Sequence, residues 1–354
     1  MALEFTKSEA KQWAKKNLKG VWADIFPSLT PDLAELDEEG IRWDVQFLIK
    51  NGFRSITITP EVCAMTVEEL KKYIGIVNDE AKGKIPTNMV SMLNTVKGDL
   101  ELIKHHEKTG GTFVGIDAPV QFYPRSADEI YRWHKSIADV TNLAVYFCFG
   151  RIHMRQFGPL YFPLELMKRI AETPNVVGMK TPGGSTVAAI AQYFHTLGDQ
   201  ILVQSPPVEN WPLFIPKYGQ QWAGSDPSYS AYQNADNPNL VRMFDFFVKG
   251  EMDKAMDIYW KVVAPLDERV EPMGQSLATY FSTAYYNPMV GKYWQWCNGG
   301  NGGSLRLPGG RLFDWKKEQM RASLMAIGLT PRENEEEFLV GRVNYAKGAR
   351  MKVY

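Results

Sequence analysis

Short runs of apolar, β-branched and aromatic residues alternate with amphipathic segments along the first two-thirds of the chain. Eight of these runs predict strands, at Val21–Phe26, Arg54–Thr59, Pro86–Ser91, Thr112–Asp117, Leu143–Cys148, Asn175–Lys180, Gln200–Gln204 and Gln220–Gly224. The segments between them predict helices, among them Asp37–Asn51, Thr66–Asp79, Ser126–Ala138, Pro163–Glu172 and Ser185–Leu197. Eightfold alternation of strand and helix predicts a closed parallel (β/α)8 TIM barrel, with an open doubly wound sheet as the alternative.

Beyond the eighth predicted strand the pattern changes to helices without strands between them. The predicted helices are Asn239–Lys249, Met252–Pro265, Gly274–Asn287 and Asp314–Ile327. We therefore expect an N-terminal segment over residues 1–18, the barrel over 19–250, a C-terminal helical region over 251–329 and a tail over 330–354. The charged and aromatic pattern of the tail leaves open whether it is ordered.

Composition narrows the class of protein further. Forty basic residues balance forty acidic ones in a chain of 354 residues, so no nucleic-acid or membrane surface is expected. Three widely separated cysteines, Cys63, Cys148 and Cys297, suit free thiols in a reducing compartment, and we expect a cytoplasmic protein. The five histidines form no metal-binding motif, so neither a metal nor another cofactor is expected.

The residue most suited to carry chemistry is Lys180, which ends the sixth predicted strand. The C-terminal ends of barrel strands open onto the face where active sites lie. Partial burial there lowers the pKa of an amine and frees it to attack a carbonyl carbon. For a lone lysine, the alternative is favoured several to one: a side chain that reaches solvent at a strand end or pairs with Asp117 or Glu61.

Two segments favour the catalytic role of Lys180, because they resemble a known family. Gly20–Gly52, and more specifically Pro163–Lys180, resemble the dihydrodipicolinate synthase/N-acetylneuraminate lyase family. The sequence Thr-Pro-Asn-Val-Val before Gly178 and the long segment after the fifth strand are most similar to the hydratase-aldolases of this family, which act on arylidene-pyruvates. The resemblance implies a class I aldolase in which Lys180 forms a Schiff base with pyruvate, in a homotetramer or homodimer.

The family pattern also suggests substrate-binding positions, with departures. Its carboxylate-binding loop, Gly-Thr-Thr-Gly-Glu, is matched here only by Thr59 and Glu61, and Pro60 removes one backbone donor. The family's tyrosine at the end of the fifth strand relays protons to the lysine adduct. Tyr146 is the candidate for that role and Tyr123 the second choice, although an ungapped alignment places Cys148 there.

Further candidates lie in the segments after the strands. Arg151 and His153, in the long segment after the fifth strand, are predicted to bind an acidic part of the substrate. Ser205 and Ser225, after the seventh and eighth strands, complete the predicted substrate-binding set. An aromatic pocket is also predicted, formed by Trp211, Trp222, Tyr229 and Tyr232.

These residues predict a lyase whose small-molecule partners are a 2-oxo acid and a bulky aldehyde, with aromatic aldehydes included. The iminium nitrogen would accept the electrons of a breaking C–C bond. Two alternatives stay open from the sequence. One is a dehydratase or hydratase of a 2-oxo acid, and the other is a non-catalytic barrel that binds a ligand or a partner.

Overall fold

A computed structural model gives the fold of the chain. It describes residues 3–59, 64–91, 95–117, 122–148, 164–182, 185–224, 226–269, 288–307 and 312–351. Within these ranges, none of the helices has the length and apolar character needed to cross a membrane.

Eight parallel strands form the wall of the barrel, each within one of the predicted segments or one residue beyond it. They are β1 (Gly20–Ile25), β2 (Ser55–Ile58), β3 (Thr87–Ser91), β4 (Phe113–Ile116), β5 (Ala144–Cys148), β6 (Val176–Lys180), β7 (Leu202–Gln204) and β8 (Trp222–Ala223). Their order around the wall is β7-β6-β5-β4-β3-β2-β1-β8, and each pair is parallel. The (β/α)8 architecture predicted from the alternation is confirmed.

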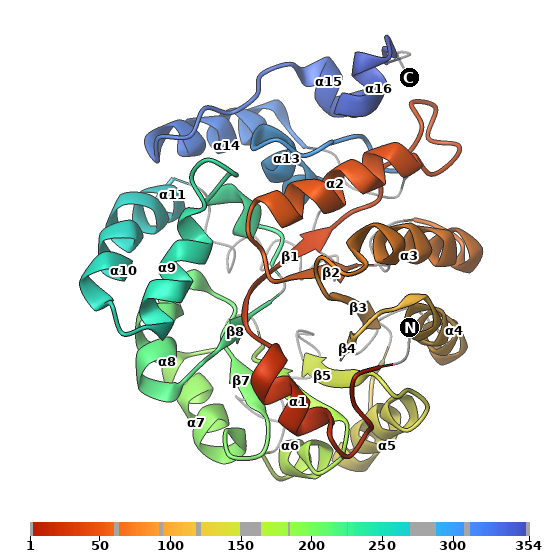
Figure 1. Cartoon of the computed structure of the whole chain (residues 1–354), viewed down its shortest axis with the longest axis vertical. Helices are drawn as coiled ribbons and strands as arrows, with labels where there is room; N and C mark the ends of the chain where they lie inside the picture. Colours follow the sequence, from red (N-terminus) through yellow and green to blue (C-terminus); the bar gives the residue numbers. More distant parts are fainter. Residues whose placement is uncertain are drawn as a thin grey trace.

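A ring of helices surrounds the strands (Figure 1). It consists of α2 (Glu38–Lys50), α3 (Val67–Ala81), α4 (Val96–Thr109), α5 (Ala127–Ala138), α6 (Leu164–Ala171), α7 (Val187–Leu197), α8 (Trp211–Tyr218) and α9 (Asn239–Val248). Side-chain caps begin several of them. Thr66 and Glu69 form the capping box that starts α3, and the Ser126 hydroxyl accepts from the Glu129 backbone at the start of α5.

An additional helix, α1 (Ala10–Asn17), packs against β5 and β6 and was not foreseen from the sequence (Figure 1). Its small buried residues Ala10 and Ala14 join an aromatic cluster inside the barrel that includes Trp22 and Phe113. Since α1 directly precedes β1, it lies at the N-terminal ends of the strands. The packed cluster therefore closes the barrel on the side away from the expected chemistry.

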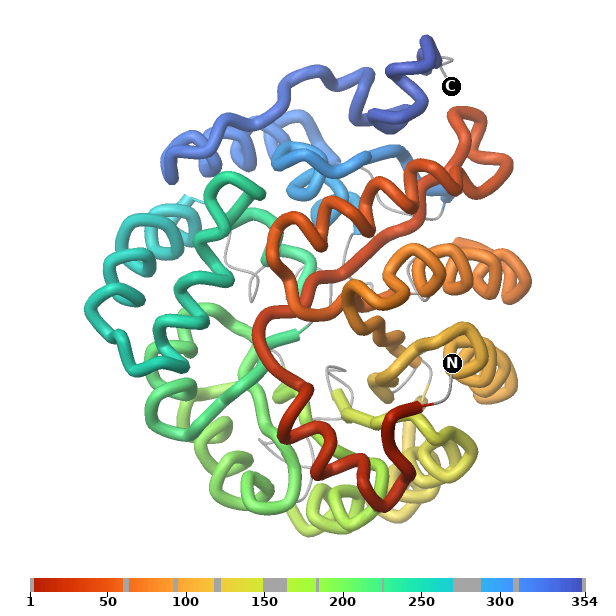
Figure 2. The backbone as a smooth tube through the Cα atoms, viewed as in Figure 1, coloured from red at the N-terminus to blue at the C-terminus, as the bar shows by residue number. Residues whose placement is uncertain are grey.

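The C-terminal region is helical and returns to the start of the barrel. Its described helices are α10 (Met252–Ile258), a π-helical turn (Tyr259–Val263), α11 (Ala264–Asp267), α13 (Pro288–Cys297), α14 (Asp314–Ala326), α15 (Glu335–Val340) and α16 (Arg342–Ala346). Figure 2 shows the C-terminal segment with α16 beside α2. There Asn344 Nδ2 donates to Asp37 Oδ2 at 2.9 Å. The described part of the tail, residues 330–351, is thus folded against α2, and the predicted helix Gly274–Asn287 lies outside the described residues.

Candidate active site

A β-bulge in β6 sets the direction of Lys180. The pairing of β5 with β6 shifts by one residue, from Val145 opposite Val176 to Tyr146 opposite Gly178. Before the bulge Val176 faces the outer core, and after it Met179 does so. Lys180 therefore faces the barrel interior, partly exposed at the C-terminal end of the strand. Without the extra residue, simple alternation from Val176 would turn Lys180 toward the helices.

The strands on either side of Lys180 place a thiol and an amide at the same level. Cys148 of β5 and Gln204 of β7 are its partners in the ladder, and both side chains are buried. Gln204 Nε2 donates to the Gly224 carbonyl at 2.6 Å, which links β7 to the end of β8. This bond lies where no ladder pairing joins the two strands.

Acidic side chains gather beyond β8. Asp226 is 7% exposed, and its Oδ1 accepts from the Ser228 backbone N–H at 2.8 Å and from the Ser228 hydroxyl at 2.6 Å. Burial raises the pKa of Asp226, while the Ser228 hydroxyl and the charge of Lys180 lower it. Asp226 therefore lies close enough to Lys180 for the charge of the lysine to act on it.

Two further carboxyl groups adjoin Asp226. Burial raises the pKa of Glu209, in the 3₁₀ turn Val208–Asn210, and the charge of Asp226 raises it further. Burial also raises the pKa of Asp267 to about 7, although the Tyr232 hydroxyl donates to this carboxyl at 2.7 Å. Burial thus shifts both carboxyl groups toward the neutral form.

The structure places Tyr146 below Lys180 rather than beside it. Its side chain is buried, and its ring crosses Gly115, where a Cβ atom would lie 2.6 Å from the tyrosine hydroxyl. The hydroxyl donates to Asn88 Oδ1 of β3 at 2.9 Å. The phenol thus extends from β5 toward β3, away from β6. Its role as proton relay stays a prediction, and this geometry does not support it.

The other predicted substrate residues are only partly brought together with Lys180. Thr59 is buried just after β2, and its hydroxyl donates to the Ile25 carbonyl at 3.3 Å. Tyr123 is 68% exposed in the segment between β4 and α5. Ser205 is fully buried, and its hydroxyl accepts from Asn210 Nδ2 at 3.0 Å, in the layer outside the barrel wall. The remaining predicted positions, Glu61, Arg151, His153 and Ser225, lie outside the described residues.

The four aromatic residues expected to form a pocket are packed in the core instead. Trp222 lies inside the barrel against Trp22 and Tyr146, with ring centroids 4.8 and 5.5 Å away. Trp211 packs edge-on against Tyr229 at 5.6 Å in the outer layer. Both tryptophans and Tyr229 are fully buried, and Tyr232 nearly so. The prediction of an open pocket lined by these rings is therefore wrong.

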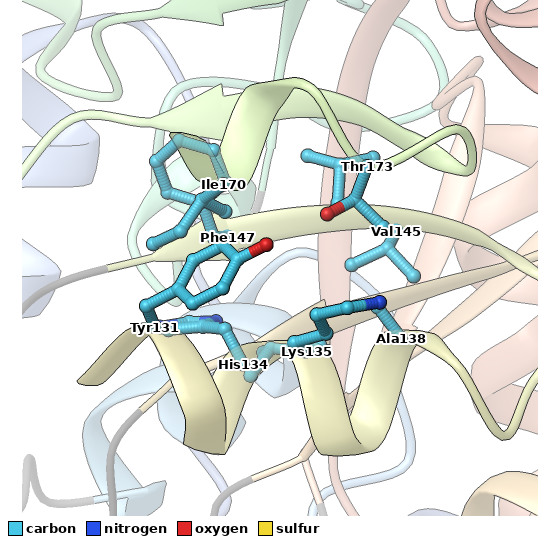
Figure 3. Close-up of a pocket in the computed structure, with 10 residues that line it drawn as sticks. Tyr131, His134, Lys135, Ala138, Val145, Phe147, Ile170 and Thr173 are labelled. Carbon is cyan, nitrogen blue, oxygen red and sulfur yellow. The ribbon is translucent and has the colours of Figure 1, made fainter. Parts of the chain in front are cut away.

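Two cavities lie away from Lys180. One, of about 10 Å³, is enclosed between α5, α6 and the outer face of β4–β6, beside Tyr131, His134 and Phe147 (Figure 3). That is the lower limit for one water molecule. A wider groove of about 610 Å³ involves Phe5 and Lys104 at the N-terminal side. Among the residues that the structure describes, no group of three or more His, Cys, Asp or Glu side chains could hold a metal ion.

Comparison with known proteins decides the family. The model of the dihydrodipicolinate synthetase family matches residues 18–277. The chain belongs to this family. A 4-hydroxy-tetrahydrodipicolinate synthase from Methanoculleus marisnigri is 24% identical over 312 residues, covering 86% of this chain and 98% of the relative. One from Streptococcus gordonii is 30% identical over 208 residues, covering 58% and 62% respectively.

Solved structures show the same fold at lower identity. PhdJ bound to a substrate intermediate superposes with a TM-score of 0.71 at 15% identity, covering 92% of this chain and 97% of PhdJ. A crystal structure of dihydrodipicolinate synthase gives a TM-score of 0.68 at 20% identity, covering 88% and 99%. As a member of the family, the chain is a lyase of the class I aldolase type.

Two residues near the lysine of this family member were not singled out from the sequence. Gln204 ends a short strand, and nothing in the sequence distinguishes it from an ordinary polar residue at that position. Asp226 stands in Asp226-Pro227-Ser228, a common turn sequence. The one available signal was the position of Asp226 just beyond a C-terminal strand end, where barrel enzymes place functional side chains.

Proposed function

We propose that Lys180 forms a Schiff base with a 2-oxo acid such as pyruvate, and that the chain makes or breaks a C–C bond beside the resulting iminium. The position of Lys180 carries this proposal, because the bulge in β6 turns its amine into the barrel at the C-terminal strand ends. The names of the relatives, 4-hydroxy-tetrahydrodipicolinate synthases, support a synthase or lyase rather than a binding protein.

The chemistry follows from the charge on the iminium nitrogen. Attack of the amine on the carbonyl carbon and loss of water leave a positive nitrogen that is double-bonded to this carbon. When a bond to the neighbouring carbon breaks, the iminium accepts its electron pair and becomes an enamine. In the opposite direction, the enamine donates that electron pair to form the new bond. Thr59, at the end of β2 on the same edge of the barrel, is the described residue best placed to orient the carboxylate of the 2-oxo acid.

For the second substrate we propose a bulky aldehyde, with aromatic aldehydes included. The small thiol of Cys148 stands beside Lys180, where the family pattern has a tyrosine, and so leaves more room next to the adduct. Tyr123 presents an exposed aromatic ring in the segment after β4. Each such aromatic contact could contribute about 1 kcal/mol to acceptor binding, enough for several-fold preferences.

The test is condensation of pyruvate with four acceptors at equal concentration: a benzaldehyde, a short aliphatic aldehyde, a sugar aldehyde and aspartate semialdehyde. We expect the benzaldehyde to react fastest and to give a product with a new C–C bond. If the sugar or aspartate semialdehyde wins by tenfold or more, the proposal of a bulky acceptor is wrong. If the 2-oxo acid only gains or loses water, the chain is a hydratase or dehydratase instead.

A further inference from the structure

Iminium formation requires a group that handles protons next to the lysine. The ammonium must lose a proton before it attacks, and the oxygen that departs as water must gain one. The family resemblance implies a tyrosine for this task. Here the residue beside Lys180 in β5 is Cys148, and the Tyr146 hydroxyl is bonded to Asn88.

The opposite side of Lys180 offers a carboxyl group. Gln204 pairs with Lys180 in the ladder, and its amide donates to the carbonyl of Gly224, two residues before Asp226. Asp226 follows β8 and so lies at the same C-terminal edge of the barrel, where the charge of Lys180 acts on it. Its carboxyl group is almost completely removed from solvent, so nearby charges act on it strongly.

The surroundings of Asp226 act on its pKa in opposite directions. Burial raises its pKa, whereas the hydrogen bonds from Ser228 and the charge of Lys180 lower it. The titratable groups on the elements packed around it are Lys180 of β6, Glu209 of the 3₁₀ turn, Tyr229, Tyr232, Asp267 of α11 and, through Tyr229, Asp24 of β1. In this mostly acidic set, Lys180 is the positive group that acts on Asp226.

We propose that Asp226 is the proton partner of Lys180 during Schiff-base formation, a role that rests on the function proposed above. The carboxylate takes one proton from the lysine ammonium, and the amine lone pair then forms the N–C bond to the carbonyl carbon. A second proton passes from nitrogen to the former carbonyl oxygen. When the C–O bond breaks, the proton held by Asp226 leaves with that oxygen as water, and the carboxylate and the iminium remain.

The experiment measures the rate of borohydride-trapped adduct formation with pyruvate between pH 5 and 10, by intact mass. In the unaltered protein the rate should follow a bell-shaped curve, because the proposed step needs one proton to be held between Lys180 and Asp226. Asp226→Asn should lower the optimum rate by roughly 10²–10⁴-fold and leave a rate that only rises with pH. Asp226→Glu should restore the bell shape.

A second variant tests the proposal without removing the carboxyl group. Ser228→Ala deletes one hydrogen bond that favours the carboxylate, so the acid limb of the curve should move to higher pH. A bell-shaped curve that persists in Asp226→Asn at the original rate would overturn the proposal. If that variant does not fold, an unshifted acid limb in Ser228→Ala overturns it. If the unaltered protein forms no adduct with any 2-oxo acid, the proposed function itself fails.

Discussion

The charges of two lysines of this chain each act on a buried aspartate, in regions with different surroundings. Lys292 of α13 is 2% exposed, and its amine donates to the Pro27 carbonyl at 2.6 Å. Its charge lowers the pKa of Asp44 of α2, whose Oδ1 accepts from the Asn301 backbone at 2.6 Å. This pair fastens the C-terminal region to the first βα unit of the barrel.

Lys180 and Asp226 occupy the strand ends instead. Lys180 is partly exposed, and the residues around it come from three different strand ends rather than from one packed helix. A buried carboxyl group on which the lysine charge acts is common to both lysines, so it does not by itself make an amine reactive. What distinguishes Lys180 is access to a substrate from the C-terminal face of the barrel.

The largest expected effect comes from replacing the lysine at the strand end. Lys180→Met should lower kcat by about 10⁶-fold, the scale seen when a covalent nucleophile is removed. The unfolding midpoint should change little, because the lysine is partly exposed and a methionine fills similar space. Steady-state kinetics and thermal unfolding check this. Turnover within tenfold of the unaltered protein would mean that another residue is the nucleophile.

The same substitution at the other lysine should lower stability and leave adduct formation at Lys180 intact. Lys292→Met removes the amine that donates to the Pro27 carbonyl and the charge that lowers the pKa of Asp44, which should cost about 1–3 kcal/mol of stability. Adduct formation at Lys180 should persist below the lowered unfolding midpoint. Urea unfolding and mass spectrometry measure the two effects. A loss of adduct formation in a folded Lys292→Met protein would break the distinction between the two regions.

The aspartate of the C-terminal pair should give stability a pH dependence. Burial raises the pKa of Asp44 from 3.8 to about 6, so the folded state favours its neutral form. Its contribution is fully present below pH 4 and is lost as pH rises through 6, by about 3 kcal/mol in all. Asp44→Asn should lack this loss in unfolding measurements between pH 4 and 7. The exposed Asp253→Asn serves as the control and should retain it.

A smaller effect is expected inside the lower half of the barrel. Tyr146→Phe leaves Asn88 Oδ1 without its donor, at a cost of about 1–3 kcal/mol, and should change kcat by less than tenfold. A fall of about 10²–10⁴-fold would restore the relay role predicted from the sequence. Tyr123→Phe, measured in parallel, shows whether the exposed tyrosine takes that role.

The strands could be predicted because each is a short apolar run between polar or glycine-rich segments, as parallel barrel strands require. The bulge in β6 could not, since Val176 and Val177 are both buried and both apolar, and nothing in such a run marks the extra residue. Helix α1 was missed because only small side chains such as Ala10 and Ala14 are buried in it.

The sequence could predict a site residue only where the residue type itself indicates the chemistry. A lysine after an apolar strand, within a segment of family-like sequence, pointed to Lys180. The prediction for Trp211 and Trp222 was wrong, because the sequence around an aromatic residue near a strand end does not show whether the ring faces the barrel opening or the core. The direction of the Tyr146 ring depends on Gly115 in the neighbouring strand, which provides the space for it.

The most direct measurement maps the adduct in the unaltered protein. The protein is incubated with pyruvate, reduced with borohydride and digested, and the peptides are sequenced by mass spectrometry. The account predicts a single reduced pyruvate adduct per chain, carried by Lys180. An adduct on Lys292 or any other lysine, or no adduct with any 2-oxo acid, would contradict it.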